Sequence, residues 1–277
     1  MSAEPLGAQA GRERGESAAW ATWQASPWGR LRYRVVGRVL RRWCTVLGPG
    51  PLRVLDAGGG DGRDALQLAL AGHAVTVLDR SPEQLALARA AAAAAGVGER
   101  LHTVAADLED LTALAALTRH REGGSGSFDV VLCHDVLQHR TSHEQVRADV
   151  ATLTSSVRPG GLLSLLAPNP AADVVAAALR EGPAAAWVAL EAERALDPAT
   201  GRSTLRLEAA FAEEALAAAG CEVAERAGVL AVTTLLEDAE RVDERLAADL
   251  EELEVELSGR PEFRPTARFW HLAGRRR

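Results

Sequence analysis

Short apolar runs and longer amphipathic stretches alternate through the middle of the chain. The apolar runs have the length of buried strands and lie at 54–57, 74–78, 101–106 and 128–134. The stretches between them have the spacing of helices. Strands that alternate with helices in this way predict a mostly parallel sheet with helices on both faces. We therefore expect a Rossmann-like, doubly wound α/β fold, whose sheet reaches seven strands with three more that follow residue 134.

A helix is predicted from about residue 29 to residue 47, ahead of the first strand. Its apolar side chains fall on two adjacent rows that face inward, namely Leu31, Val35 and Val39, and Val36, Leu40, Trp43 and Leu47. Arg32 lies in line with these rows, and an inward-facing arginine needs an anionic partner. The partner is either the carboxylate of a bound cofactor or an aspartate at the edge of the core.

The pattern changes after residue 168. Alanine-rich helices are predicted over 171–195, broken at Gly182-Pro183, and they should form a cap above the carboxyl ends of the strands, where open α/β sheets bind ligands. Further elements are predicted as a helix at 207–219, a strand at 221–232, a helix at 237–257 and an antiparallel strand at 264–272 near the sheet edge. We expect a disordered tail (1–19) and one domain (20–277), divided into a core (50–168), a cap and substrate region (169–210) and a C-terminal sheet edge (211–277).

Composition and charge exclude several classes of protein. No apolar run approaches the ~20 residues that span a bilayer, and the polar stretch at 1–16 is not expected to act as a signal peptide. The three cysteines lie far apart in apolar segments, which indicates reduced thiols in a cytoplasmic protein. All 31 basic side chains are arginines, and the absence of lysine excludes Schiff-base chemistry. The histidines and cysteines show no metal-site spacing.

An outer row of arginines follows the predicted helix at 29–47, formed by Arg30, Arg34, Arg38 and Arg41. The row is either a solvated helix face or the footprint of a nucleic acid. Because the chain carries a net charge of −7, the solvated face is favoured.

The first predicted strand runs into a glycine-rich turn with the spacing Asp56-x-Gly58-x-Gly60-x-Gly62. Glycine permits the positive φ values of such a turn and leaves the backbone open to a ligand. Asp79 ends the second strand, 23 residues after Asp56, where a carboxylate is placed to bind a ribose diol. The third glycine of the dinucleotide fingerprint is replaced by Arg63, and no phosphate-binding loop with lysine is present. A nucleoside-containing cofactor is therefore expected.

This turn resembles motif I of the class I S-adenosylmethionine (SAM) methyltransferases. Asp107 after the third strand, the strand at 128–134 and the sequence Arg158-Pro159-Gly160-Gly161 before the fifth strand resemble the later motifs of that class. The resemblance implies that SAM is the cofactor. Its site would be formed by a set of residues at the strand ends, namely Gly58 and Gly60 around the methionyl group and sugar, Asp79 at the ribose, Asp107 and Leu108 beside the adenine, and also Asp56, Arg80 and His134.

A closer resemblance links the chain to the bacterial tRNA 5-carboxymethoxyuridine methyltransferases. It rests on Trp28-Gly29-Arg30-Leu31-Arg32, the glycine turn, the segment at 134–137 and the segment at 267–271. It implies that Arg32 binds the SAM carboxylate and that the substrate is a modified wobble uridine of tRNA. Two departures affect substrate recognition. The family's histidine and tyrosine after strand six are replaced within 232–236, and Gln138-His139 stands where the family has an acidic and an aromatic residue.

Three functions follow from these patterns. The favoured one is methyl transfer from SAM to a small organic molecule held under the cap. The alternatives are the methyl esterification of tRNA and, in another class, a SAM-binding regulatory protein without catalysis. A hydroxyl or amine acceptor would need a base, for which histidine is suited near pH 7.

Three histidines are candidates on the acceptor side of the site. His134 ends the fourth strand and is the candidate base, and His139 and His271 are candidate substrate residues. The alternative for His271 is a hydrogen-bonded histidine of the core. Asp135 is expected to point away from the site into a helix cap. Three tryptophans, Trp20, Trp23 and Trp28, precede the helix at 29–47 and serve either as a lid or as packing anchors.

Overall fold

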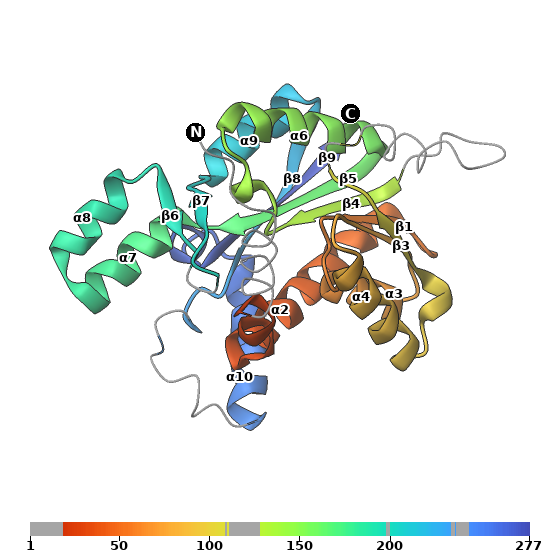
Figure 1. Cartoon of the computed structure of the whole chain (residues 1–277), viewed down its shortest axis with the longest axis horizontal. Helices are drawn as coiled ribbons and strands as arrows, with labels where there is room; N and C mark the ends of the chain where they lie inside the picture. Colours follow the sequence, from red (N-terminus) through yellow and green to blue (C-terminus); the bar gives the residue numbers. More distant parts are fainter. Residues whose placement is uncertain (1–18, 109, 111–127, 198–199, 234–235, 237–243) are drawn as a thin grey trace, which may run out of the picture.

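The computed structural model describes residues 19–108, 110, 128–197, 200–233, 236 and 244–277. A seven-stranded sheet has the order β3-β2-β1-β4-β5-β9-β8. Figure 1 shows the sheet in the middle of the molecule, with helices on either side. Its strands are β1 (Arg53–Ala57), β2 (Ala74–Asp79), β3 (Leu101–Ala105), β4 (Phe128–His134), β5 (Val157–Pro168), β8 (Cys221–Val229) and β9 (Phe269–Arg276). The first five are parallel, and β9 is antiparallel to both of its neighbours. The predicted doubly wound α/β fold is confirmed.

Helices cover both faces of this sheet (Figure 1). One face carries α2 (Pro27–Cys44), α3 (Arg63–Leu70), α4 (Pro82–Ala94) and α10 (Glu244–Ser258). The other carries α6 (His143–Ser156) and α9 (Ala209–Ala218). Short 3₁₀ helices lie at η1 (Thr45–Leu47), η2 (Gly98–Arg100), η3 (Leu137–His139) and η6 (Arg264–Thr266). Within the part of the chain that the structure describes, no helix has the length and hydropathy to cross a bilayer.

Helix α2 begins where its sequence supplies an N-cap. The Ser26 hydroxyl accepts a hydrogen bond from the Gly29 N–H at 3.1 Å, and Pro27 occupies the first turn, where its missing N–H costs nothing. Both predicted apolar rows are buried up to Trp43. Arg32 is 1% exposed, so its predicted inward orientation is confirmed.

The C-terminal strand differs from the prediction. The strand begins at Phe269 rather than at residue 264, because Arg264–Thr266 forms a 3₁₀ turn around Pro265. It lies between β5 and β8 and not at the sheet edge, and its residues from Phe269 to Gly274 are buried on both faces of the sheet. The edge strand is β8, whose buried and exposed residues alternate near its start. The predicted tail lies outside the described residues, apart from residue 19.

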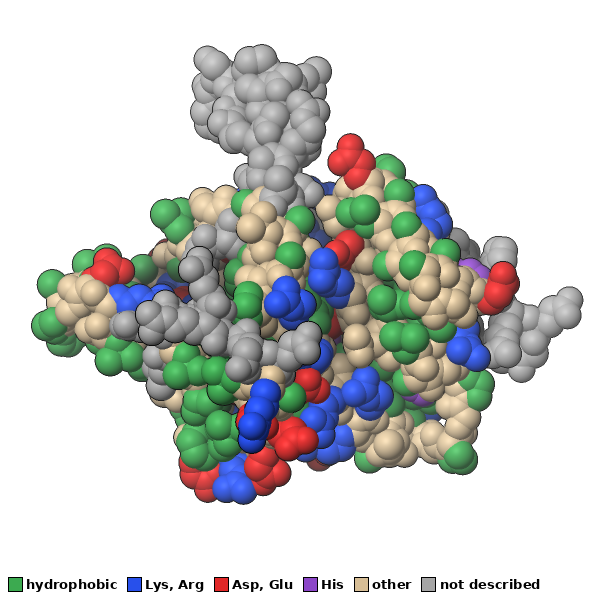
Figure 2. Space-filling model, turned by 90° about the horizontal axis from the view of Figure 1, so that it is seen from below, with side chains coloured by type: hydrophobic (Ala, Val, Ile, Leu, Met, Phe, Trp, Pro, Cys, Tyr) green, Lys and Arg blue, Asp and Glu red, His purple; other side chains and the backbone are tan. Residues whose placement is uncertain are grey.

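The predicted cap consists of two parts with different positions. Helices α7 (Pro170–Glu181) and α8 (Pro183–Glu191) form a hairpin that turns at Gly182, with φ 92°, and projects from the sheet in Figure 1. Helix α8 buries no side chain, and Figure 2 shows apolar side chains on the projecting lobe. The following ribbon of β6 (Arg194–Leu196) and β7 (Ser203–Leu205) leads back toward the strand ends. The ribbon, rather than the helices, therefore approaches the predicted ligand site.

One buried carboxylate ties α10 to the segment that follows β8. Glu254 is fully buried and accepts hydrogen bonds from the N–H groups of Ala231, Val232 and Thr233 at 2.6, 3.0 and 2.8 Å. Glu254→Gln places an NH₂ group against these donors, so we expect the free energy of unfolding to fall by about 1–3 kcal/mol. Urea denaturation measures it. The control Glu251→Gln, in a partly exposed ion pair on the same helix, should cost less than about 1 kcal/mol. Equal losses in the two variants would contradict the anchoring role.

Candidate functional site

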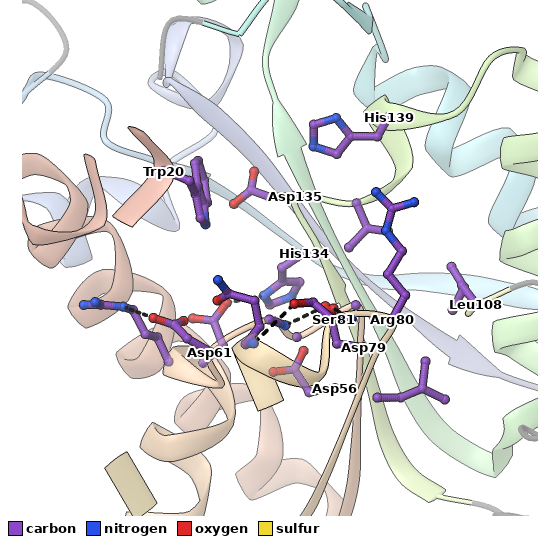
Figure 3. Close-up of a pocket in the computed structure, with 18 of the residues that line it drawn as sticks. Trp20, Asp56, Asp61, Asp79, Arg80, Ser81, Leu108, His134, Asp135 and His139 are labelled. Carbon is purple, nitrogen blue, oxygen red and sulfur yellow. Dashed lines mark hydrogen bonds and ion pairs between the residues drawn. The ribbon is translucent and has the colours of Figure 1, made fainter. Parts of the chain in front are cut away.

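A cavity of about 890 Å³ lies at the carboxyl ends of β1, β2 and β4 (Figure 3). Open α/β sheets bind ligands at this edge, and pockets for small ligands have volumes of this order. Every predicted cofactor residue lines it: Arg32, Asp56, Gly58, Gly60, Asp79, Arg80, Asp107, Leu108 and His134. His139 also lines the cavity.

The glycine turn after β1 needs glycine for two different reasons. Gly58, Gly60 and Gly62 all have positive φ, at 76°, 54° and 73°. A Cβ at Gly58 would lie 2.6 Å from a methyl of Val136, and one at Gly62 would lie 2.9 Å from the Ala88 Cβ. At Gly60 no atom lies closer than 3.9 Å. The outer two glycines therefore allow the turn to pack against the protein, whereas Gly60 leaves open space on the ligand side.

Asp79 links the glycine turn to the start of α4. Its Oδ2 accepts the Gly60 N–H at 2.9 Å, and its Oδ1 accepts the Ser81 N–H at 2.8 Å. Each carboxylate oxygen can accept a second hydrogen bond, so a ribose diol fits this group. Figure 3 shows Arg80 and Leu108 on the same side of the cavity, opposite Trp20.

Asp56 lies under the turn as a buried carboxyl group. Its Oδ2 has no hydrogen-bond partner among the described residues. Burial, together with the charge of Asp64, raises the pKa of Asp56 well above its usual value. A buried polar atom without a partner is costly, so this oxygen is a candidate contact for a bound cofactor.

Arg32 stands between two aspartates. Its Nη1 lies 2.7 Å from Asp64 Oδ2, and its Nη2 lies 2.7 Å from Asp135 Oδ2. Burial acts to raise the pKa of Asp64, but the Arg32 charge outweighs it and holds that pKa below its usual range. The ion-pair alternative predicted for Arg32 is thus the arrangement in the structure. The guanidinium Nε has no hydrogen-bond partner among the described residues, which leaves one donor for a ligand carboxylate.

A hydrogen-bonded relay continues from Asp64 into the core. His134 Nδ1 lies 2.9 Å from Asp64 Oδ2, and Nε2 lies 2.9 Å from Ser164 Oγ. Ser164 Oγ is also 2.8 Å from His271 Nε2. Since both ring nitrogens of His134 have partners inside the protein, neither is free to take a proton from an acceptor. This geometry argues against the predicted role of His134 as a base and favours a positioning role.

His271 belongs to the core, which corrects its prediction as a substrate residue. The ring is fully buried and does not line the cavity. Its centroid lies 4.2 Å from that of Trp43 and 5.0 Å from that of His134. The reason is that β9 pairs with a strand along each edge, while Trp43 of α2 packs on the His271 ring from the face of the sheet. The alternative of a hydrogen-bonded core histidine describes the structure.

Buried histidines should make stability depend on pH. Burial lowers the pKa of His271 well below 6.5 and that of His139 to about 4. As the pH falls below about 6.5, these two histidines bind protons in the unfolded chain but not in the folded chain. The free energy of unfolding therefore falls by about 1.4 kcal/mol for each such histidine and each pH unit. We expect urea denaturation between pH 7.5 and 5.5 to show this loss. His271→Gln, which keeps a donor for Ser164, should reduce the slope by one proton, and an unchanged slope would contradict the assignment.

His139 faces the cavity in a positively charged environment. Burial and then Arg202 are the main causes of its lowered pKa, with smaller effects from Arg80 and Arg140. The ring is therefore neutral near pH 7, and its Nδ1 has no hydrogen-bond partner within the described part of the chain. A neutral ring in this position is suited to bind a polar group of a ligand rather than to act as a strong base.

Several residues of the cavity wall were not predicted from the sequence. Asp135 lines the cavity and pairs with Arg32, so the expectation that it points into a helix cap is wrong. Gln24 is buried and donates to the Tyr33 hydroxyl at 2.7 Å. Trp20 lines the cavity, whereas Trp23 packs in a core cluster with Phe269 and Trp28. Further wall residues are Gln138 and three residues between β6 and β7, namely Asp197, Thr200 and Arg202. The only sequence signal for them was the trio of tryptophans and the position of 135–139 after a strand.

Comparisons with known sequences match the part of the chain that contains the glycine turn, Asp79, Asp107 and His134. Residues 54–161 match the family described as "Methyltransferase domain". The tRNA 5-carboxymethoxyuridine methyltransferase of Escherichia coli is 36% identical over 138 residues, which are 50% of this chain and 48% of that protein. A ubiquinone biosynthesis O-methyltransferase of Xanthomonas axonopodis is 33% identical over 132 residues, 47% of this chain and 49% of that protein. The chain thus spans about half the length of the curated relatives it matches.

A comparison with solved structures supports the fold. The magnesium protoporphyrin IX methyltransferase of Synechocystis, solved with bound S-adenosylhomocysteine, superposes with a TM-score of 0.60 and 17% sequence identity. The alignment covers 94% of each chain. At this identity the likeness concerns the arrangement of helices and strands, and it includes the regions beyond the matched domain.

Proposed function

We propose that this chain, a member of the class I SAM-dependent methyltransferases, transfers the methyl group of SAM to a small organic molecule. The observation that carries the proposal is a cavity of about 890 Å³ in which the glycine turn and Asp79 face an opposite wall of polar and aromatic side chains. Such a cavity can hold a cofactor and an acceptor side by side. The three cysteines are buried and unpaired, which supports a cytoplasmic location.

The residues present fit SAM at four points. Gly60 leaves open space, Asp79 retains acceptor capacity for the ribose, and Arg32 Nε and Asp56 Oδ2 are buried polar atoms without a partner among the described residues. SAM supplies an electrophilic methyl group on a sulfonium. The task of the protein is then mainly to hold the acceptor atom in line with that methyl group. We assign Arg32 to the methionyl carboxylate and Asp107 with Leu108 to the adenine.

The outer face of α2 supports a small acceptor rather than tRNA. Arg34 Nε lies 2.8 Å from Glu251, and an Arg38 nitrogen lies 3.8 Å from the same carboxylate. Figure 2 shows acidic side chains among the basic ones on the side of the molecule seen from below. A row of arginines that is partly neutralised by α10 binds phosphates less strongly than a free row would.

The tRNA of the curated relative is the second candidate substrate, supported by the 36% identity over half the chain. If tRNA is bound, its affinity should fall steeply with salt and should weaken in Arg34→Ala and Arg38→Ala. Binding that is insensitive to salt and to both changes would remove this candidate.

The test of the proposed function is the formation of S-adenosylhomocysteine. The purified chain, shown by calorimetry to bind SAM, is incubated with panels of aromatic hydroxyl compounds, amines, carboxylic acids and bulk tRNA. Turnover with a small molecule supports the proposal, and turnover with tRNA alone replaces it by the second candidate. SAM binding without turnover on any panel would favour a regulatory protein, and no SAM binding would overturn the cofactor assignment.

A further inference from the structure

A second, smaller cavity of about 60 Å³ adjoins the site on the side of the β6–β7 ribbon. Three residues, Trp20, Asp135 and Asp197, line both cavities, so the two spaces meet at these side chains. The wall of the small cavity is largely apolar and aromatic, with Trp20, Trp23, Pro168, Leu196 and Phe269. The Trp20 and Trp23 rings stack at 4.8 Å, and Trp23 meets the Phe269 ring edge-on at 6.3 Å. Such a wall favours a flat apolar group.

Asp135 is the carboxylate at the junction of the two cavities. Figure 3 shows it between Trp20 and His139, with its oxygens toward the tryptophan. Its Oδ2 accepts from Arg32 at 2.7 Å, and Arg32 is the one side chain that hydrogen-bonds to the carboxylate within the described residues. Oδ1 is therefore available to a ligand.

The backbone of Asp135 is held in a conformation that side chains rarely adopt. Its φ is +57°, and among the described non-glycine residues only Leu230 also has a positive φ. The Asp135 N–H donates to the Leu166 carbonyl at 2.9 Å, which fixes the residue against β5. Strained backbone of this kind often serves a functional site, and here it accompanies a carboxylate that lines two cavities. Asparagine tolerates the same conformation, so Asp135→Asn can test the side chain without changing the turn.

We propose that Asp135 takes the proton of the methyl acceptor and that this acceptor is an aromatic hydroxyl compound whose ring lies in the large cavity against Trp20, at the junction with the small one. The inference rests on the proposed methyl transfer. The acceptor oxygen forms a bond to the methyl carbon as the bond from that carbon to the sulfonium sulfur breaks. The electron pair of the broken bond stays on sulfur, and the hydroxyl proton moves to Asp135 Oδ1. The products are the methyl ether and S-adenosylhomocysteine, whose sulfur is neutral.

The carboxylate at the junction favours an acceptor that is neutral and has a proton to lose. A carboxylate acceptor placed there would lie beside Asp135, whereas Asp173 at the far wall is paired with Arg268 at 2.6 Å. An amine can attack before it loses its proton, so it does not require the base. A phenolic hydroxyl has a pKa of about 10 and is within reach of a carboxylate base, whereas an alkyl hydroxyl is far less acidic.

Burial supports Asp135 as a base. It is the main cause that raises the pKa of this carboxyl group, while Arg32 and His134 act in the opposite direction and Asp64 adds to the rise. The other charged and titratable groups around it include Asp197, Arg202, Arg80, Arg140 and His139 in the wall of the large cavity, and the Asp173–Arg268 ion pair in the small one. A carboxylate with a raised pKa accepts a proton more readily than an exposed one.

The test compares Asp135→Asn with the unchanged chain on a panel of mono- and dihydroxy aromatic compounds. We expect kcat/KM, measured at saturating SAM, to fall by about 10²–10⁴-fold. The variant should remain folded, because Arg32 keeps its ion pair with Asp64. The rate of the variant should rise with pH as the phenol ionises by itself, and the loss should shrink for phenols with electron-withdrawing substituents. Trp20→Leu should raise KM about tenfold with a smaller change in kcat. Asp129→Asn, at the opposite end of β4, is the matched control and should keep its activity.

The outcomes separate this inference from the proposed function. If the unchanged chain forms no S-adenosylhomocysteine with any acceptor, the proposed function fails. Turnover of amines or carboxylic acids but not phenols would overturn the acceptor class while leaving methyl transfer intact. Turnover of phenols that Asp135→Asn leaves within threefold, with an unchanged pH profile, would overturn the role of Asp135.

Discussion

Replacing Asp79 with alanine should weaken SAM binding by about two to four orders of magnitude. Hydrogen bonds to a charged group contribute about 1.5–3 kcal/mol each, and a ribose diol would make two of them, which together correspond to a factor of about 10²–10⁴. Asp79 also accepts from Gly60 and Ser81, so its loss frees the glycine turn as well. Titration calorimetry with SAM measures the effect.

Two further variants show whether the loss belongs to the ribose contact. Asp79→Asn keeps one carbonyl acceptor and should retain an affinity between those of the alanine variant and the unchanged chain. Asp129→Asn removes a carboxylate that accepts from the Arg53 N–H at the other end of the sheet, and it should bind SAM normally. An unchanged affinity in Asp79→Ala would sink the assignment of Asp79, provided that circular dichroism shows the fold intact.

Replacing Arg32 with methionine should lower the free energy of unfolding by about 3–5 kcal/mol, measured without cofactor. The change leaves the carboxylates of Asp64 and Asp135 buried without their shared cation. The pKa of Asp64 is lower in the folded chain than in the unfolded chain, where it is about 3.9. The ion pair of Asp64 with Arg32 therefore stabilises the fold fully above about pH 3.9, and this stabilisation is lost only as the pH falls through the pKa of the folded state. Chemical denaturation at pH 7 therefore reports the full effect.

Two control variants show whether the loss of stability comes from the buried position of the Arg32 charge or from the removal of any arginine. Arg38→Met removes a cation that is 41% exposed on the same helix and should cost less than about 1 kcal/mol. The combined variant Arg32→Met, Asp64→Asn, Asp135→Asn should recover part of the loss, because no unpaired charge remains. Equal costs for Arg32→Met and Arg38→Met would mean that the buried network contributes nothing special to stability.

The sequence by itself determined the features that depend on short-range order. The alternation of apolar runs and amphipathic stretches indicated the α/β sheet, because strand and helix periodicities are local properties of the chain. The spacing of Gly58, Gly60 and Asp79 indicated the ligand side of the sheet, since glycine at positive φ and an acidic strand end are encoded in a few residues. The inward orientation of Arg32 followed from the helical repeat alone.

Only the tertiary structure decided which side chains share the site. The periodicity of β9 is compatible with an edge or an inner position, and the pairing of His271 with Leu166 on one side and Ala227 on the other made it a core residue. Asp135 turned toward the cavity because contacts with β5 and Arg32, 103 residues away, fixed its backbone and carboxylate. The ribbon rather than the α7–α8 hairpin lines the cavity for a similar reason. These outcomes depend on contacts between distant segments, and such contacts leave no periodic signal in the sequence.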